Sequence, residues 1–338
     1  MAMVKKILPW IFFSCLAIIL VGSLVIRIMN APLGPKLEVT EAVVQPTSTK
    51  PITAIDSVSE TLTTEIPGVC GGQGSLTLLV LGESFPVGNQ LRGADAIRLV
   101  QVNYDTGEIW ITAFPPVLLV NTSNIPSVKS NASTLTAAYY LAKQSLNDSE
   151  RNKMALASSA IAQALNDNFA LSPDNYLSMK EVTFQDVIDT LGGLPVYFPQ
   201  TVTNPSNGQV FAQAGQQTLS GQQALDFSRF IEGGSPARIS EWNRFDRQIQ
   251  ILVAIMQQVL SLKGVSNFPG LVNDFYQDVV TDLSANQLMD LSCVLQNTGL
   301  SNMQYIEFKQ NLTSGEQNNV LIPNTSEITQ YYQPYFTP

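Results

Sequence analysis

Arg229, Arg244 and Arg247 are the side chains of this sequence best suited to bind a charged ligand. Arg244 and Arg247 are three positions apart, so on a helix they occupy neighbouring positions of one face. Their helix is expected to begin near Ser240, which places both close to the positive end of its dipole, where anions bind. Arg229 is the last residue of a shorter predicted helix that precedes this one in the sequence. Because guanidinium groups match phosphate oxygens, this spacing indicates a phosphate or pyrophosphate site.

A second interpretation makes the same arginines surface residues that pair with nearby acids. Glu232, Glu241 and Asp246 are the candidate partners. Exposed ion pairs are common and contribute little free energy. The spacing alone therefore leaves both interpretations open.

Two predicted helices position the arginines. Residues 219–229 have the apolar spacing of a short amphipathic helix, with Ser220 as its N-cap. A Gly-Gly-Ser-Pro-Ala loop follows, and the second helix covers residues 240–263.

Apolar runs and helical periods alternate along the rest of the chain. An Asp-Thr-Gly triplet at 105–107 resembles the motif of aspartic proteases, but it joins two predicted strands and has no second copy, so it indicates a hairpin turn. The interleaved elements predict an α/β fold, an αβα layered domain around a central mixed β-sheet. Strands are expected at 75–82, 96–104, 108–114, 175–180, 194–199 and 303–310, with a sheet extension at 117–121. Helices are expected at 133–145, 148–168 and 182–193, and two more in 270–298. The tail is expected to hold a strand or turn and a short helix.

The N-terminal leader predicts an N-terminal transmembrane helix. Residues 7–26 carry no charge over 20 positions, enough to cross a bilayer core. Lys5 and Lys6 precede this run, which favours a cytoplasmic N-terminus and a main domain outside the membrane. A cleaved signal peptide is the competing interpretation.

The chain divides by composition into three parts. Residues 1–30 are the cytoplasmic tip and anchor, and residues 31–70 form an extended linker rich in Pro, Thr and Ser. Residues 71–338 are expected to form the extracytoplasmic domain. The leader contributes three basic residues and no acid, so 15 basic and 27 acidic residues follow it, a net charge of −12. Such an acidic surface argues against non-specific nucleic-acid binding.

Histidine is absent from the sequence, which excludes Ser-His-Asp and Cys-His catalysis and histidine-bound zinc. The three cysteines are Cys15 in the leader, Cys70 and Cys293. Cys70 and Cys293 form either one disulfide or two unpaired thiols, because connectivity does not follow from sequence.

Five sequence blocks together resemble a known family. Residues 219–229 read Leu-Ser-Gly-Gln-Gln-Ala-Leu-Asp-Phe-Ser-Arg, and residues 241–248 follow Glu-x-x-Arg-x-x-Arg-Gln. With residues 78–83, 93–115 and 187–199 they resemble the LytR-CpsA-Psr (LCP) family, or cell-envelope-related transcriptional attenuator domain. The resemblance implies a membrane-anchored protein that moves a glycopolymer from a polyprenyl-pyrophosphate carrier to peptidoglycan as a phosphodiester. It also implies an apolar groove for the lipid, a cationic mouth, and Mg²⁺ as cofactor.

The resemblance assigns roles to individual residues. Arg229, Arg244 and Arg247 match the phosphate-binding arginines of the family, and Gln248 matches their partner position. Asp95 matches the aspartate of an Arg-Ser-Asp motif, a magnesium ligand or base. Asp95 and Arg229 are therefore the expected catalytic residues.

Several motif residues of the family are replaced. Gly93 occupies the arginine position of Arg-Ser-Asp, with Arg92 one place earlier, and residues 115–117 read Pro-Pro-Val where the family has Pro-Arg-Asp. A further arginine position is Ile231. Arg92 and Arg238 are candidate substitutes for the lost charges.

Three functions follow from this pattern. The first is a transferase with a rearranged pocket. The second is a catalytically weak or inactive relative that binds a polyprenyl-phosphate lipid or a partner as a scaffold. In the third, the arginines form ion pairs only.

Overall fold

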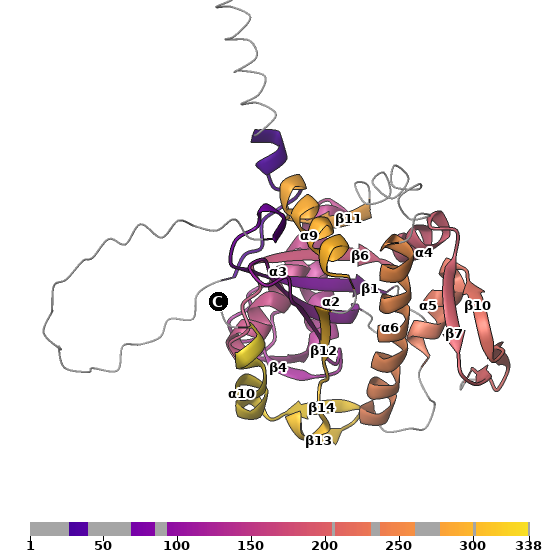
Figure 1. Ribbon diagram of the computed structural model, residues 1–338. Helices are drawn as coiled ribbons and strands as arrows, with labels where there is room; N and C mark the ends of the chain where they lie inside the picture. Colours follow the sequence, from indigo (N-terminus) through magenta and orange to yellow (C-terminus); the bar gives the residue numbers. More distant parts are fainter. Residues whose placement is uncertain are drawn as a thin grey trace, which may run out of the picture.

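A computed structural model describes residues 27–39, 69–84, 93–204, 207–230, 237–260, 278–299 and 302–336 (Figure 1). At the centre of these residues lies a six-stranded sheet with strand order β11-β6-β1-β2-β3-β12. The β1–β6 and β3–β12 pairs are parallel and the other pairs are antiparallel, so the predicted central mixed sheet is confirmed. The strands are β1 (Ser75–Glu83), β2 (Ala94–Asn103), β3 (Ile109–Ala113), β6 (Asn175–Lys180), β11 (Val279–Thr281) and β12 (Met303–Ile306).

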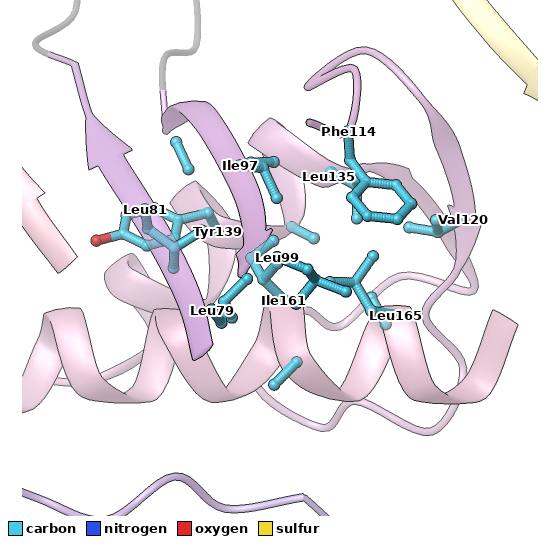
Figure 2. Packing of buried hydrophobic residues seen from close by; sticks show 14 of the residues in the cluster. Leu79, Leu81, Ile97, Leu99, Phe114, Val120, Leu135, Tyr139, Ile161 and Leu165 are labelled. Carbon is cyan, nitrogen blue, oxygen red and sulfur yellow. The ribbon is translucent and has the colours of Figure 1, made fainter. Parts of the chain in front are cut away.

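One face of the sheet is covered by α2 (Leu135–Ser145), α3 (Glu150–Phe169) and α10 (Thr325–Phe336). Alternation along the strands directs Leu79 and Leu81 of β1 to this face. Figure 2 shows how side chains of β1, β2 and α3 pack together. This cluster is the main hydrophobic core of the described residues.

The other residues of the same strands face a second helical layer. Leu76 and Leu78 of β1 pack with the apolar residues of α9 (Ala285–Thr298), and Leu252 of α6 (Ala237–Leu260) joins them. Helices therefore cover both faces of the sheet.

A smaller unit packs on the outer side of α6. It consists of α4 (Glu181–Thr190), the antiparallel pair β7 (Leu194–Phe198) and β10 (Gly215–Leu219), and α5 (Gly221–Arg229). Figure 1 shows α6 between this unit and the central sheet. The unit has its own core, which includes Phe198, Phe227 and Phe230. Short elements complete the described fold: η1 (Val69–Gly71), β4 (Leu119–Asn121), β5 (Ala132–Thr134), β8 (Val202–Thr203), β9 (Val210–Ala212), η3 (Gln310–Leu312), β13 (Thr313–Gln317) and β14 (Val320–Pro323).

Two of the expected elements differ in the structure. The predicted sheet extension at 117–121 is wrong, because β4 pairs with β5 in a separate sheet. Leu118 N donates to the carbonyl oxygen of Pro115 at 2.9 Å, so the Pro-Pro sequence turns the chain off the sheet. The expected pair of helices in 270–298 is also wrong in part, because β11 is a buried β-branched strand that pairs with β6.

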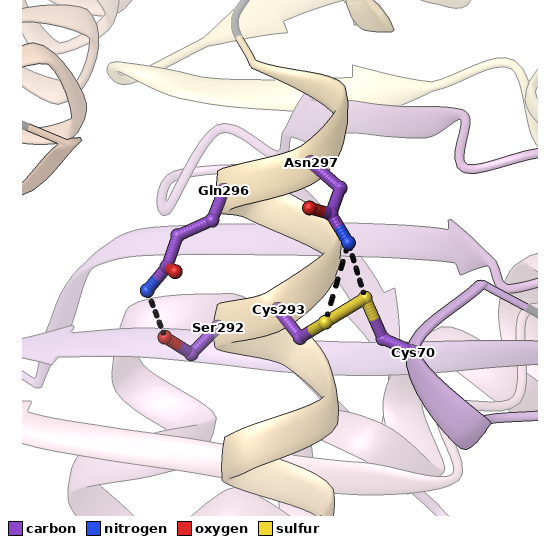
Figure 3. Close-up of a disulfide and its surroundings, with 5 residues drawn as sticks. All are labelled: Cys70, Ser292, Cys293, Gln296 and Asn297. Atoms are coloured by element: carbon purple, nitrogen blue, oxygen red, sulfur yellow. Dashed lines mark hydrogen bonds between the residues drawn. A yellow bond between two sulfur atoms is a disulfide. The ribbon is translucent and has the colours of Figure 1, made fainter.

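A disulfide joins Cys70 and Cys293, with 5.7 Å between their Cα atoms. It connects the segment before β1 to α9. Figure 3 shows Asn297 beside it, with Nδ2 at 3.0 Å from Sγ of Cys70 and 3.4 Å from Sγ of Cys293. Of the two alternatives that the sequence left open, the disulfide is the one found.

Residues 31–39, the first part of the predicted linker, lie against the domain. Leu37 N donates to the Asp282 carboxylate at 2.9 Å, and the Tyr176 hydroxyl donates to the carbonyl of Pro35 at 2.9 Å. Residues 40–68 of the linker lie outside the described residues.

Within the part of the chain that the structure describes, no helix combines the length and the apolar character needed to span a bilayer. The predicted anchor at residues 7–26 lies outside that part.

Candidate functional site: an apolar pocket with a polar end

A pocket lies between the central sheet and the helices α4, α5 and α6. Its volume is about 270 Å³, near the lower end of the range for ligand pockets, roughly 300 Å³. A pocket of this volume encloses only part of a long hydrocarbon ligand. The apolar walls are formed by Val80, Leu81, Met179, Phe184, Val187, Leu225, Ile251, Leu252 and Ile255.

The polar side chains of the pocket come mainly from strand and helix ends. β1 and β6 are parallel, so their carboxyl ends meet at one edge, the usual place for ligands in α/β sheets. β2 is antiparallel to β1, so its beginning lies at the same edge and brings Asp95 there. The polar residues of the lining are Glu83, Ser84, Asp95, Arg98, Lys180, Glu181, Ser228, Arg229 and Gln248.

Arg229 lines the pocket. It is the last residue of α5, whose start is fixed by a capping box between Ser220 and Gln223. Its Nη1 atom forms an ion pair with Oε2 of Glu181 at 2.5 Å. The Arg229 side chain is 20% exposed, so its guanidinium remains accessible while part of its charge is balanced.

Arg244 is buried and forms an ion pair with Glu241, one turn earlier on α6. Burial raises the pKa of Glu241, and the Arg244 guanidinium opposes this shift. The negative charge of Asp95, which lines the pocket, raises the pKa of Glu241 further. The Arg244–Glu241 pair is one that the ion-pair interpretation of the sequence contained.

Arg247 is directed to the end of α5. Its Nε atom donates to the carbonyl oxygen of Phe227 at 3.1 Å, and its Nη2 atom donates to that of Phe230. These carbonyls belong to the last turn of a helix, where backbone acceptors lack intrahelical donors. Gln248, in contrast, lines the pocket and donates from Nε2 to the Ser228 carbonyl at 3.4 Å.

The positions of the replaced motif residues do not accommodate large charged groups. A Cβ atom at Gly93 would lie 2.1 Å from the carbonyl oxygen of Thr136 in α2. Pro116 is buried, and Val117 packs against the main core. The backbone of α2 therefore occupies the space that the first side-chain atom of an arginine at position 93 would need. Arg92, Ile231 and the side chain of Arg238 lie outside the described residues.

Arg98 is a pocket residue that the sequence interpretation did not single out. It lies in β2 opposite Val80 of β1 and is only 7% exposed. Its Nη2 atom donates to Oε1 of Gln248 at 3.0 Å. The sequence did carry a signal for the burial of Arg98. Ile97 and Leu99 point to one face of β2, so Arg98 lies on the opposite face, where its neighbours along the strand are apolar.

The residues that the structure describes contain no group of three or more His, Cys, Asp or Glu side chains placed to hold a metal ion. Mg²⁺ in phosphate-binding proteins is often held by one or two carboxylates together with substrate oxygens. Asp95 at the polar end of the pocket fits that simpler arrangement.

Comparisons with known proteins agree with the family resemblance of the sequence blocks. Polyisoprenyl-teichoic acid–peptidoglycan teichoic acid transferase TagU of Oceanobacillus iheyensis is 32% identical over 129 residues, which are 38% of this chain and 38% of the relative. TagU of Enterococcus faecalis is 29% identical over 150 residues, 44% of this chain and 45% of the relative. The aligned sequence thus spans less than half of each relative.

The fold is similar to solved structures at low sequence identity. TagV of Bacillus subtilis superposes with a TM-score of 0.58 and 16% identity, covering 79% of this chain and 100% of that chain. A family model matches residues 43–334, which is most of the sequence. On this match, the chain belongs to the LytR_cpsA_psr family.

Proposed function

We propose that this chain is a cell-envelope protein that transfers a glycopolymer from a polyprenyl-pyrophosphate carrier to peptidoglycan, forming a phosphodiester. The observation that carries the proposal is an apolar pocket with Arg229 and Asp95 at its polar end. An isoprenoid chain fits the apolar walls, and phosphates fit the guanidinium group. The Oceanobacillus iheyensis relative is named for a transfer between such partners.

The transfer breaks one bond and forms one. A hydroxyl oxygen of peptidoglycan attacks the phosphorus that bears the glycopolymer, the phosphoanhydride bond breaks, and polyprenyl phosphate leaves. Reactions of this type depend mainly on positioning and on neutralisation of charge. Arg229 and Gln248 bind phosphate oxygens, and the buried Arg244–Glu241 pair adds to the local field.

Asp95 has two roles open to it in this reaction. As a base it accepts the proton of the attacking hydroxyl. As a ligand it would hold Mg²⁺, which supplies neutralisation of the phosphate charge when bound. The anchor at residues 7–26 places the domain outside the cell membrane in a single-pass arrangement, with the N-terminus in the cytoplasm. Nucleic acid is not a partner.

One observation favours a second candidate, a lipid-binding scaffold without turnover. Arg229 and Arg244 each already pair with a carboxylate, and the positions 93 and 116 supply no charge. Loss of one charge-stabilising donor lowers rates by about 10²–10³. A protein of this kind binds the carrier lipid and holds it for a partner.

Both candidates are tested with the full chain in detergent micelles. Transfer from an undecaprenyl-pyrophosphate-linked glycan to peptidoglycan fragments is measured with Mg²⁺ present, for the wild type and for Asp95→Ala. Turnover that Asp95→Ala abolishes supports the transferase, and lipid binding without turnover supports the scaffold. Absence of both binding and turnover rejects both candidates.

A further inference from the structure

Arg98 occupies a position where a charged side chain is costly. It lies within β2, between Val80 of β1 and Ala113 of β3, and the face it shares with Val100 is otherwise apolar. Burial of a charge without a counter-charge lowers stability strongly. A position of this kind is normally filled by a hydrophobic residue, so the arginine requires an explanation outside the packing of the sheet.

The contacts of Arg98 within the described residues do not balance its charge. One nitrogen, Nη2, donates to the neutral amide of Gln248. The other, Nη1, is buried and has no hydrogen-bond partner among these residues. The phenol of Tyr305 in β12 interacts with the Arg98 guanidinium, but it is neutral, because burial raises its pKa to about 12. Arg244 also acts on Arg98, carries the same sign, and has Glu241 as its carboxylate partner. Burial lowers the pKa of Arg98, but arginine side chains keep their charge in proteins.

A second donor in the same pocket also lacks a partner. The hydroxyl of Ser84, at the end of β1, is buried and makes no hydrogen bond in the described structure. Ser84 and Arg98 both line the pocket, together with Arg229. The two unused donors and the guanidinium of Arg229 match the oxygen atoms of a phosphate, which are acceptors only and carry negative charge.

We propose that Arg98 binds a phosphate group of an isoprenoid phosphate inside the pocket, with Arg229 and Ser84 as the other donors. This role deepens the proposed function and depends on it, because the pocket must take an isoprenoid phosphate. Arg98 supplies, from the middle of the sheet, a cationic charge that positions 93 and 116 do not provide. It is therefore a specificity residue that selects isoprenoid phosphates over uncharged isoprenoids.

The test compares three ligands on the full chain in detergent micelles: geranylgeranyl pyrophosphate, geranylgeraniol and inorganic pyrophosphate. Dissociation constants are measured by calorimetry for the wild type, Arg98→Met, Arg98→Lys and Arg151→Met. Methionine keeps an unbranched side chain but removes the charge. Arg151 belongs to α3, on the other face of the sheet, and donates to the Leu33 carbonyl, so Arg151→Met is the matched control.

For Arg98→Met we expect affinity for geranylgeranyl pyrophosphate to fall by on the order of tenfold to 100-fold, the loss typical of a hydrogen bond to a charged group. Affinity for geranylgeraniol should stay unchanged. The affinity of Arg98→Lys for geranylgeranyl pyrophosphate should lie between those of the wild type and Arg98→Met. Arg151→Met should bind it as tightly as the wild type. The ligand-free Arg98→Met variant should also melt at a temperature equal to or above that of the wild type, because a buried unpaired charge has been removed.

The contrary outcomes separate the two proposals. If the wild type binds geranylgeranyl pyrophosphate and Arg98→Met binds it equally well, Arg98 does not bind phosphate while the proposed function stands. A lowered melting temperature of ligand-free Arg98→Met would make Arg98 a structural residue and overturn the inference. Equal wild-type affinity for inorganic and geranylgeranyl pyrophosphate would identify a free-phosphate site. If neither isoprenoid binds to the wild type, the proposed function fails as well.

Discussion

Arg229 and Arg247 carry the same guanidinium group but have different surroundings. Arg229 lines the pocket and pairs with Glu181, whereas Arg247 donates to two backbone carbonyls beside the end of α5. The sequence spacing alone made the two residues equivalent candidates for phosphate binding. Their partners in three dimensions give them different expected roles.

Replacement of Arg247 by Met should lower stability more than it lowers ligand binding. The carbonyls of Phe227 and Phe230 lose their donor, which costs about 1–3 kcal/mol of unfolding free energy when such groups stay buried. Urea unfolding measures this loss. Calorimetry with geranylgeranyl pyrophosphate should give a dissociation constant within about twofold of the wild type, since the pocket lining is retained. A loss of binding at unchanged stability would instead place Arg247 in the phosphate site.

The close contact between Gly93 and α2 determines what can be restored in this chain. Gly93 N donates to Oγ1 of Thr136 at 3.1 Å, and its carbonyl accepts from Ser84 N at 3.0 Å. These bonds hold the start of β2, the end of β1 and α2 together, at the edge where Asp95 lies. The family's arginine cannot be returned to position 93 unless α2 moves.

Gly93→Ala should therefore destabilise the protein through overpacking. The new Cβ atom would lie 2.1 Å from the Thr136 carbonyl oxygen, and backbone atoms yield less than flexible side chains. We expect a loss of about 1–3 kcal/mol in urea unfolding, or more if α2 cannot shift. Gly315→Ala, in β13, is the control, because its Cβ would meet nothing within 4 Å. Equal stability of the two variants would show that α2 does not close over Gly93.

Helices with a clear apolar period were predictable from sequence, and short strands were not. The amphipathic α5 and its Ser220 cap were predicted closely, because local capping and periodicity decide them. β11 was assigned to a helix, since three residues are too few to show an alternation and its pairing with β6 is non-local. Arg98 was overlooked for a related reason: its burial depends on α6 packing over the sheet.

At the scale of the whole molecule, the Cys70–Cys293 disulfide crosslinks two distant parts of the sequence. It joins residues separated by 223 positions, and so it ties the beginning of the domain to α9. Closing so long a segment restricts the unfolded chain considerably. The pocket lies beside other parts of the sheet, so its lining does not include either cysteine.

The double substitution Cys70→Ala and Cys293→Ala should lower the unfolding free energy by about 2–5 kcal/mol. Urea unfolding of this variant and of the wild type, both without reductant, measures the difference. Binding of geranylgeranyl pyrophosphate below the unfolding transition should be retained. Unchanged stability would mean that the crosslink adds nothing beyond the packing of α9.

The central claim is that an isoprenoid chain enters the pocket between the sheet and α4, α5 and α6, with its phosphates at the polar end. A crystal structure of the protein with geranylgeranyl pyrophosphate tests it most directly. The account predicts electron density for the chain against Phe184 and Ile255, and a phosphate within hydrogen-bond distance of Arg98 or Arg229. Density for the lipid elsewhere, with this pocket filled by solvent or side chains, would contradict the account.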